Sequence, residues 1–427
     1  MARWLYSAAI LALLPWALVH LLWRARRQPA YLSHWHERFA RYGGRDEGRK
    51  PTIWLHAVSV GETRAAQPLV SALREAYPSH RILFTHMTPT GRETSESLYG
   101  DSVSRVYLPY DTPGAMRRFL RQFRPNFGLI LETELWPNLI AACRAESVPL
   151  LLVNARLSER SARRYARFST LTRQSLGRLT AVAAQAPADA GRLASLGAVG
   201  VTVTGNLKFD ILVPPSQIEL GRELRHRCGD RAVWLAASTR EGEEALILEA
   251  WRKALPEART GAGGSARPLL VIVPRHPQRF DDVVRLAGER GFRVQRRSAG
   301  EAVSADTDIL VGDSMGEMFA WYVSADLAFI GGSLLDYGSQ NLIEAAACGT
   351  PILIGPSTRN FADAAREALA CGAAQAISDA DDLISAVTAL LSNPAARARM
   401  AAAGKDFAGR HRGATARTME LISRAVR

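Results

Sequence analysis

The sequence predicts an α/β protein with two doubly wound, mostly parallel sheets and an N-terminal membrane-anchor helix. Three observations lead to this fold class. Short apolar runs alternate with amphipathic helical stretches from Pro51 onward. The pair Pro214-Pro215 separates two such series, and 427 residues are enough for two domains with full cores. The first residues instead form one long uncharged apolar segment.

The N-terminal segment Trp4–Trp23 contains no Asp, Glu, Lys or Arg, and it is long enough to cross a bilayer as a helix. Three arginines follow at once: Arg24, Arg26 and Arg27. By the positive-inside rule they place the rest of the chain in the cytoplasm. A cleaved signal peptide is an alternative, although no A-x-A site follows. Pro15 and His20 also leave open a helix that lies in the membrane interface.

The amino-acid composition predicts an anionic partner. The formal net charge is +13, which favours nucleic acid, an anionic membrane surface or a phosphorylated substrate. The four cysteines are scattered without a CxxC pair, which argues against a zinc site or a disulfide framework.

Seven apolar runs in the first half are candidate strands. They are Thr52–His56, Arg81–Thr85, Arg105–Leu108, Phe127–Leu131, Leu150–Val153, Ala181–Ala184 and Val201–Thr204. Ligands of such sheets bind beyond the carboxyl ends of the strands. Four charged residues follow strands and are expected at one edge: Glu62, Glu132, Arg156 and Lys208. Two carboxylates and two cations there indicate acid–base chemistry on a charged substrate.

Structural explanations remain open for each of these residues. Glu62 is also suited to the first turn of a helix, where negative charge is favoured. Glu132 can cap the helix that Pro137 begins, and Lys208 can be a solvated loop lysine. The arginine-rich stretch from 156 to 178 has a solvated basic face as its default, with contact to lipid phosphates as the sharper hypothesis.

The second half repeats the pattern. Its candidate strands are Val233–Ala237, Leu269–Val273, Asp308–Val311, Asp326–Ile330 and Pro351–Ile354. Arg275 follows the second of these strands and is placed to grip a phosphate, unless it forms a strand-end salt bridge. Met315-Gly316-Glu317 opens a helix whose N–H groups can meet a base or a phosphate.

The most informative stretch runs from Gly331 to Gly355 and reads as a glycine turn, a helix and a strand. Gly331, Gly332 and Ser333 let the backbone approach a phosphate. Asn341 begins the helix, and Glu344 is placed to accept the hydroxyls of a ribose. An ordinary βαβ turn with a capping Asn is the alternative.

These segments together resemble the 3-deoxy-D-manno-octulosonic acid (Kdo) transferase family of lipopolysaccharide synthesis. The matching runs are HAVSVGE (56–62), MTPTGR (87–92), VYLPYD (106–111), ETELWPN (132–138), NARLS (154–158), TGNLKFD (204–210), VPRHPQRF (273–280), GDSMGEM (312–318), GGS (331–333) and NLIEAAA (341–347). The resemblance covers nearly the whole chain and is weakest in the terminal region.

The resemblance implies two Rossmann-like domains that face across a cleft, the GT-B type of glycosyltransferase. It implies inverting transfer of Kdo from CMP-Kdo to a hydroxyl of the phosphorylated lipid A precursor, lipid IVA, at the cytoplasmic face of the inner membrane. By position, Glu62 matches the general base, and Glu132 and Lys208 match stabilisers of the transition state. The CMP site is matched by Pro274, Arg275, Met315, Gly316, Glu317, Asn341 and Glu344.

The remaining expectations concern the acceptor, partners and domains. The acceptor-binding candidates are Ser59, Gly61, Arg92, Arg156, Arg163 and Arg164. Anionic inner-membrane lipids are expected partners, and nucleic acid is not. No cofactor or metal is expected: the Asp-x-Asp spacing at Asp306/Asp308 precedes a strand and that at Asp379/Asp381 opens a late helix, and neither is the position of a metal-binding pair. The expected parts are an anchor (1–27), a basic connector (28–50), an acceptor-binding domain (51–212), a linker (213–230), a CMP-sugar domain (231–405) and a C-terminal helix returning to the first domain (406–427).

Three other functions stay open. A nucleotide-sugar epimerase of similar two-domain form would need neither an anchor nor a basic acceptor face. A dinucleotide-dependent oxidoreductase is disfavoured because GxGxxG is missing after the first strand. A non-enzymatic protein that binds anionic lipid would be insensitive to CMP.

Overall fold

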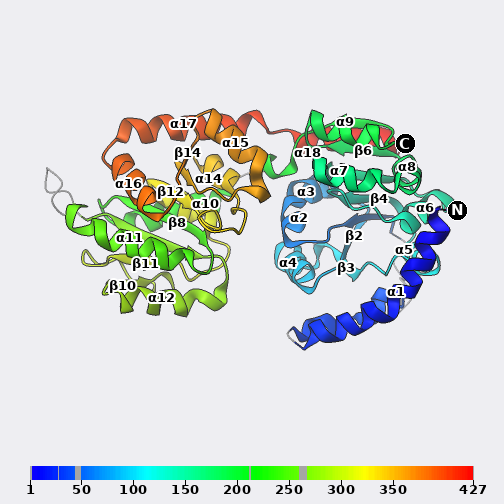
Figure 1. Ribbon diagram of the computed structural model, residues 1–427, viewed down its shortest axis with the longest axis horizontal. Helices are drawn as coiled ribbons and strands as arrows, with labels where there is room; N and C mark the ends of the chain where they lie inside the picture. The colour runs from blue at the N-terminus through cyan, green and yellow to red at the C-terminus, as the bar shows by residue number, and fades with distance from the viewer. Residues whose placement is uncertain (1, 27, 44–49, 211–212, 259–266, 427) are drawn as a thin grey trace. The chain divides into compact units, whose positions relative to one another are not determined.

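The computed structural model describes residues 2–26, 28–43, 50–210, 213–258 and 267–426. The chain forms two compact units (Figure 1). Unit 1 consists of Met1–Asp210 and His411–Arg427, and unit 2 of Ile211–Arg410. Arg27, the boundary residue 212 and part of the expected connector lie outside the described residues.

Unit 1 is built on a seven-stranded parallel sheet with the order β3-β2-β1-β4-β5-β6-β7. Its strands are β1 (Thr52–His56), β2 (Arg81–His86), β3 (Ser104–Tyr107), β4 (Pro125–Leu131), β5 (Leu150–Ala155), β6 (Ala181–Ala184) and β7 (Val201–Val203). The order reverses between β1 and β4, so the loops after these two strands lie next to each other. Ligands of open α/β sheets bind at such a switch point.

Helices cover both faces of this sheet. They are α2 (Val60–Ala65), α3 (Gln67–Ala76), α4 (Pro89–Tyr99), α5 (Pro113–Phe123), α6 (Pro137–Ala145), α7 (Glu159–Ala166), α8 (Ser169–Leu176), α9 (Pro187–Ser195) and α18 (Ala414–Ala425). Side-chain oxygens cap several of them, as Thr88 does for α4 and Thr112 for α5. Trp54 and Phe119 are buried in the core on one face of the sheet. Leu69 and Ile422 are buried on the other, which places the C-terminal helix in unit 1.

Helix α1 (Ala2–Ala25) lies along the side of unit 1 and packs beside α6 and α8 (Figure 1). It is the one helix in the described residues that is long and apolar enough to cross a membrane. The 3-10 helices η1 (Pro29–Leu32) and η2 (Trp35–Phe39) follow it.

Unit 2 contains the second seven-stranded parallel sheet, with the order β10-β11-β9-β8-β12-β13-β14. Its strands are β8 (Val233–Thr239), β9 (Leu269–Pro274), β10 (Val294–Arg296), β11 (Ile309–Val311), β12 (Leu327–Ile330), β13 (Ile352–Ile354) and β14 (Ala374–Ala376). Its helices are α10 (Pro215–Arg227), α11 (Glu243–Ala258), α12 (Phe280–Glu289), α13 (Met318–Ser324), α14 (Leu342–Cys348), α15 (Ala362–Ala370), α16 (Ala380–Leu391) and α17 (Pro394–Arg410). The strand order of this sheet also reverses, between the neighbouring strands β8 and β12.

The predicted fold class is confirmed, and three local predictions are corrected. Residues 215–227 of the expected linker form α10, which packs against α13 within unit 2. The two edge strands β10 and β14 were not predicted, because each has only three residues and no run of large apolar side chains. The C-terminal helix expected at 406–427 is divided: α17 extends to Arg410 and α18 begins at Ala414. Gly413 between them has a φ of 91°, which interrupts the helical backbone.

Candidate active site and nucleotide site

Glu62 lies at the start of α2, directly beyond the carboxyl end of β1. Ser59 caps this helix, since its Oγ accepts the Glu62 N–H at 3.2 Å. The Glu62 carboxylate in turn accepts the Ser59 hydroxyl at 2.8 Å and the Val58 N–H at 2.7 Å. This reciprocal capping arrangement fixes the position of the carboxylate without neutralising it. The structure therefore shows the contacts expected of a residue in the first turn of a helix.

Burial makes Glu62 a carboxylate that titrates near neutral pH. Its pKa is raised to about 7, chiefly because the side chain is withdrawn from water. The hydrogen bonds from Ser59 and Val58 lower this pKa, and the nearby charges of Glu132 and Glu134 raise it. A base poised near 7 is well matched to removing a proton from a sugar hydroxyl at neutral pH.

Glu132 and Lys208 form an ion pair next to this site. Glu132 follows β4 with a φ of 56°, in the left-handed region that non-glycine residues seldom occupy. The Lys208 Nζ lies 3.6 Å from Glu132 Oε1, and both side chains are partly buried. Lys208 belongs to the 3-10 helix η4 (Leu207–Asp210), and the Asn154 side-chain oxygen accepts the Leu207 N–H at 3.0 Å. The edge of the sheet thus brings these two predicted residues together.

A small polar pocket of about 160 Å³ is present at this edge. It is lined by Glu62, Glu132, Thr133, Glu134, Arg156, Leu157, Ser161 and Tyr165. Glu134 and Tyr165 are contributors that the sequence did not single out, and burial raises the pKa of Glu134. Sequence offered one signal for Glu134, its place in the run ETELWPN. The pocket combines three carboxylates with one guanidinium, which suits binding and deprotonating a polar substrate group.

A larger depression, about 660 Å³, lies at the opposite end of the same strands. Its lining includes Lys50, Arg74, Arg81 and Ser104, near the amino ends of β1, β2 and β3. None of the predicted catalytic residues lines it. Two of the predicted catalytic residues, Glu62 and Glu132, line the smaller pocket instead.

The predicted acceptor-binding residues divide into three groups. Arg156 lines the pocket, and Arg163 and Arg164 are exposed on α7 beside it. Ser59 and Gly61 belong to the start of α2, where Ser59 positions Glu62. Arg92 instead pairs with the buried Glu37 at 3.0 Å, so the structure gives it a scaffolding contact.

In unit 2, the glycine turn after β12 is held by Glu243, a fully buried residue. Its carboxylate accepts the N–H groups of Gly332 at 2.7 Å, Leu334 at 3.0 Å and Arg240 at 2.8 Å. A Cβ on Gly331 would lie 2.5 Å from the Ser238 carbonyl oxygen, so only glycine fits. Glu243 thereby joins the loops after β8 and β12 at the switch point of the sheet.

Ser333, the third residue of the predicted phosphate loop, has structural contacts within the turn. The residue is fully buried, and its Oγ accepts the Gly355 N–H at 2.8 Å and donates to the Ile330 carbonyl. These hydrogen bonds close the glycine turn that contains Gly331 and Gly332.

Cationic groups gather beside this turn. Arg275 follows β9, and its Nε donates to Gln340 Oε1 at 3.3 Å. Arg240 lies over the Tyr337 ring at 4.6 Å, and its Nη1 is 3.0 Å from His276 Nε2. Burial and the charges of Arg240, Arg275 and Arg279 lower the pKa of His276. Such a concentration of positive charge suits a phosphate, and Arg240 and His276 extend the predicted set.

At the two helix starts expected to hold the nucleotide, the polar side chains form hydrogen bonds and ion pairs within the protein. Asn341 caps α14 through its Oδ1 and donates from Nδ2 to Glu344 Oε1 at 3.0 Å. Glu317 precedes α13, and its carboxylate pairs with Arg297 at 3.4 Å and accepts the Ser314 hydroxyl. Met315 is 57% exposed and Gly316 has a φ of 81°, so the backbone between them is open to a ligand.

Comparison with known proteins identifies the family. The model of a family described as 3-deoxy-D-manno-octulosonic-acid transferase (kdotransferase) matches residues 33–211, and a glycosyl transferase-like model matches 278–423. A 3-deoxy-D-manno-octulosonic acid transferase of Bordetella pertussis is 42% identical over 99% of both chains. This chain belongs to the Kdo transferase family. A transferase of the same description from Haemophilus influenzae is 36% identical over 99% of this chain and 98% of the other.

Solved structures confirm the fold of this Kdo transferase family member. A UDP-GlcNAc 2-epimerase from Neisseria meningitidis covers 87% of the chain and all of its own, with a TM-score of 0.60 and 14% identity. A glycosyltransferase from Rickettsia africae covers 89% of the chain and all of its own, with a TM-score of 0.57 and 12% identity. At such identities the epimerase shares the fold alone, whereas the curated relatives are transferases. The protein is therefore a glycosyltransferase that transfers Kdo.

In the part of the chain that the structure describes, no group of three or more His, Cys, Asp or Glu residues is arranged to hold a metal ion. Asp306 and Asp308, one of the Asp-x-Asp spacings, both pair with Arg293. Metal-independent transfer stays a prediction.

Proposed function

We propose that this Kdo transferase takes Kdo from CMP-Kdo and transfers it, with inversion and without a metal, to a hydroxyl of the phosphorylated lipid A precursor lipid IVA. The observation that carries the mechanism is the buried Glu62 carboxylate, whose pKa is raised to about 7 next to the Glu132–Lys208 ion pair. The acceptor and donor follow from the family, and the basic surface of unit 1 supports a phosphorylated acceptor.

In the proposed reaction, the Glu62 carboxylate takes the proton of the acceptor hydroxyl. The hydroxyl oxygen then forms a bond to the anomeric carbon of Kdo from the face opposite CMP. The bond from that carbon to the phosphate oxygen breaks, and CMP leaves with the electron pair. Inversion follows from attack on the opposite face in a single displacement.

The remaining charges have distinct parts. The arginines beside the glycine turn, Arg240 and Arg275, stabilise the negative charge that grows on the departing CMP phosphate. Lys208 supplies positive charge in unit 1, and its pairing with Glu132 holds its ammonium in place. Arg156 in the pocket and the exposed Arg163 and Arg164 suit the phosphates of the acceptor. We place the protein at the cytoplasmic face of the inner membrane, with anionic lipids as partners.

Replacing Glu62 by Gln tests the assignment. Loss of a general base costs about 10²- to 10⁴-fold in rate, while the CMP site lies in the other unit. We expect Glu62→Gln to lose transfer by that factor and to bind CMP with unchanged affinity in calorimetry. Near-full transfer by this variant would refute the base assignment, and joint loss of CMP binding would indicate a folding defect.

A further inference from the structure

Both ends of the apolar helix α1 are fastened to unit 1. Near its start, the Tyr6 hydroxyl donates to Asp111 Oδ2 at 3.0 Å, and the buried Ser7 Oγ donates to Asn138 Oδ1 at 2.9 Å. Asp111 and Asn138 are themselves buried in unit 1, where they join the loop before α5 to the start of α6. The N-terminal end of α1 is therefore tied to the domain by buried polar contacts.

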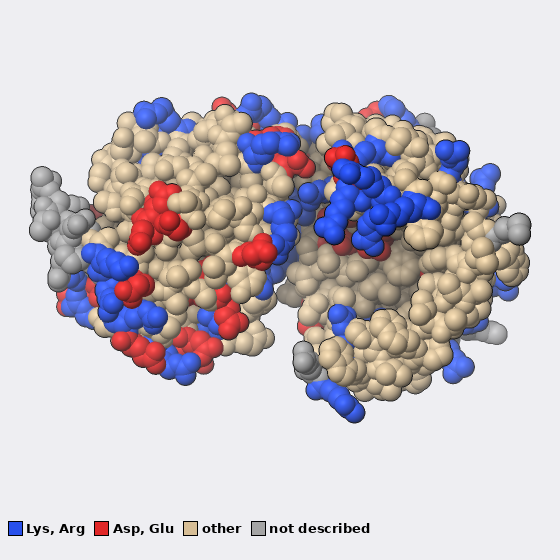
Figure 2. All heavy atoms as spheres, viewed as in Figure 1, with Lys and Arg blue, Asp and Glu red and all other residues tan. Residues whose placement is uncertain are grey.

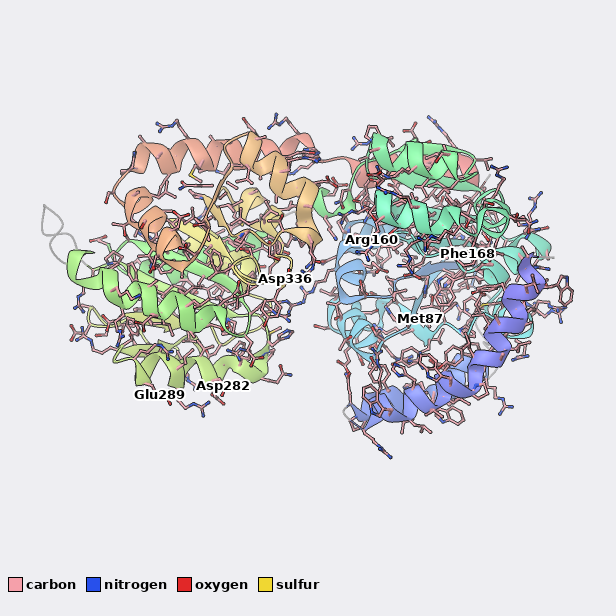
Figure 3. The ribbon with its side chains drawn as sticks, viewed as in Figure 1. Met87, Arg160, Phe168, Asp282, Glu289 and Asp336 are labelled. Atoms are coloured by element: carbon pink, nitrogen blue, oxygen red, sulfur yellow. The ribbon has the colours of Figure 1, made fainter. Side chains whose placement is uncertain are left out.

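The segment that follows α1 is fastened to the same domain. In η2, the Glu37 carboxylate accepts the Tyr107 N–H at 2.7 Å and pairs with Arg92. The Arg38 guanidinium donates twice to the Met87 carbonyl at 3.1 Å and lies 4.2 Å from the Tyr107 ring centre. Met87, in the loop after β2, is labelled in Figure 3. Leu21 and Ala25 near the end of α1 are buried, and α1 packs against η1. Both ends of α1 thus lie against unit 1, the unit that contains Glu62.

A spanning helix cannot satisfy these contacts. With 24 residues, α1 is about 36 Å long, enough for the roughly 30 Å of hydrocarbon in a bilayer. If it spanned, Tyr6 and Ser7 would lie on the far side of the membrane from Asp111 and Asn138. Figure 1 shows α1 lying along unit 1 instead of projecting from it. The geometry favours a helix that lies parallel to the membrane surface.

The two faces of α1 differ as that placement requires. The inner face contains the buried Ser7, Leu21 and Ala25, which follow helical spacing. The outer face exposes large apolar side chains: Trp4 (75%), Leu5 (73%), Leu11 (52%), Leu13 (53%), Trp16 (64%), Val19 (64%), Leu22 (56%) and Trp23 (49%). Tryptophans at both ends are typical of the membrane–water interface.

A basic cluster accompanies the apolar face. Arg160, Arg163, Arg164 and Arg167 are exposed on α7 and at its end, and the neighbouring Phe168 is 69% exposed. Helix α8, which follows, packs beside α1. Figure 2 shows a group of Lys and Arg side chains over α7 and uncharged residues over most of α1, on the same face of unit 1. An apolar strip next to concentrated positive charge is complementary to a bilayer with anionic headgroups.

We infer that α1 is an in-plane anchor: its outer face enters one leaflet of an anionic bilayer, the arginine cluster contacts the headgroups, and both ends of α1 stay on the catalytic side. This inference does not rest on the transfer reaction. It defines a docking face made of the exposed α1 residues above together with Arg160, Arg163, Arg164, Arg167 and Phe168.

Protease access to terminal tags tests the topology. The full chain carries one cleavable tag at each end and is expressed in a Gram-negative bacterium, whose membranes are prepared as right-side-out spheroplasts and as inverted vesicles. We expect both tags to be cleaved in inverted vesicles and protected in spheroplasts. Cleavage of the N-terminal tag in spheroplasts, with the C-terminal tag protected, would show that α1 spans and would overturn the inference. Recovery of the protein in the soluble fraction would overturn it as well.

Vesicle binding tests the charged half of the docking face. An arginine near an anionic surface contributes about fivefold to binding, so Arg160→Gln with Arg167→Gln is expected to weaken sedimentation with phosphatidylglycerol vesicles about 25-fold. Binding to neutral phosphatidylcholine vesicles should not change. The matched control replaces two equally exposed arginines of unit 2, Arg285 and Arg366. Equal weakening in the control would refute a localised docking face.

Discussion

The raised pKa of Glu62 makes the reaction rate depend on pH in a way that can be calculated. With a pKa of about 7, about one-tenth of Glu62 is ionised at pH 6 and about nine-tenths at pH 8. Because only the carboxylate can accept the proton, kcat/KM should rise about tenfold between these two pH values. A glutamate with its ordinary pKa would already be ionised at pH 6, and the rate would be nearly constant.

The acceptor phosphates can also titrate in this range, so a second variant is needed. The charge of Glu134 is one cause of the raised pKa of Glu62. Glu134→Gln removes that charge, makes ionisation of Glu62 easier and should move the acidic limb to lower pH. Ionisation of the substrate would leave the limb in the same place in both enzymes.

The assay measures initial rates of Kdo transfer at subsaturating acceptor from pH 5.5 to 9. The kcat/KM profile is the informative one, because it reports groups of the free enzyme and free substrate. A rate that is flat between pH 6 and pH 8 would refute the pKa argument. A limb that Glu134→Gln does not move would show that Glu62 is not the titrating group.

Three further predictions concern binding and stability. Arg275→Ala should weaken CMP binding by about 10- to 100-fold in calorimetry, because a charge-assisted hydrogen bond is lost. Arg275→Lys should restore part of the affinity. Unchanged CMP affinity in both variants would show that Arg275 does not belong to the CMP site. Asp210 accepts the Gly413 N–H at 2.6 Å and caps α18, so Asp210→Ala should cost about 1 kcal/mol in denaturant unfolding; an unchanged midpoint would contradict the capping role. Gly331→Ala should lower the melting temperature and CMP affinity together, because its Cβ would meet the Ser238 carbonyl at 2.5 Å; normal values for both would show that the turn can adjust.

The sheet architecture, and the grouping of charged residues at one edge of the sheet, could be predicted from the sequence. Buried parallel strands are continuous apolar runs, and polar residues that follow them must meet at one edge. For this reason Glu62, Glu132 and Lys208 could be grouped before any coordinates were known, and their pocket and ion pair now bring them together. Local rules also predicted the capping of α14 by Asn341.

Contacts between segments that are distant in the chain could not be predicted from the sequence. Arg92 was expected near the acceptor, but its partner Glu37 lies 55 residues away, in a stretch that sequence describes only as a basic connector. Glu243 holds a turn 89 residues further along the chain, and nothing local marks that role. The orientation of α1 depends on Tyr6 and Ser7 meeting Asp111 and Asn138, so hydropathy alone left spanning and interfacial placement open.

The central claim is tested most directly by the reaction itself. The purified protein is incubated with freshly generated CMP-Kdo, a tetra-acylated lipid A precursor and a chelator, and the lipid product is weighed by mass spectrometry. The account predicts a gain of one or more Kdo masses, undiminished by the chelator. If CMP binds but the lipid mass does not change even when divalent metal is added back, the proposed acceptor is wrong; recovery only with metal would contradict metal-independent transfer.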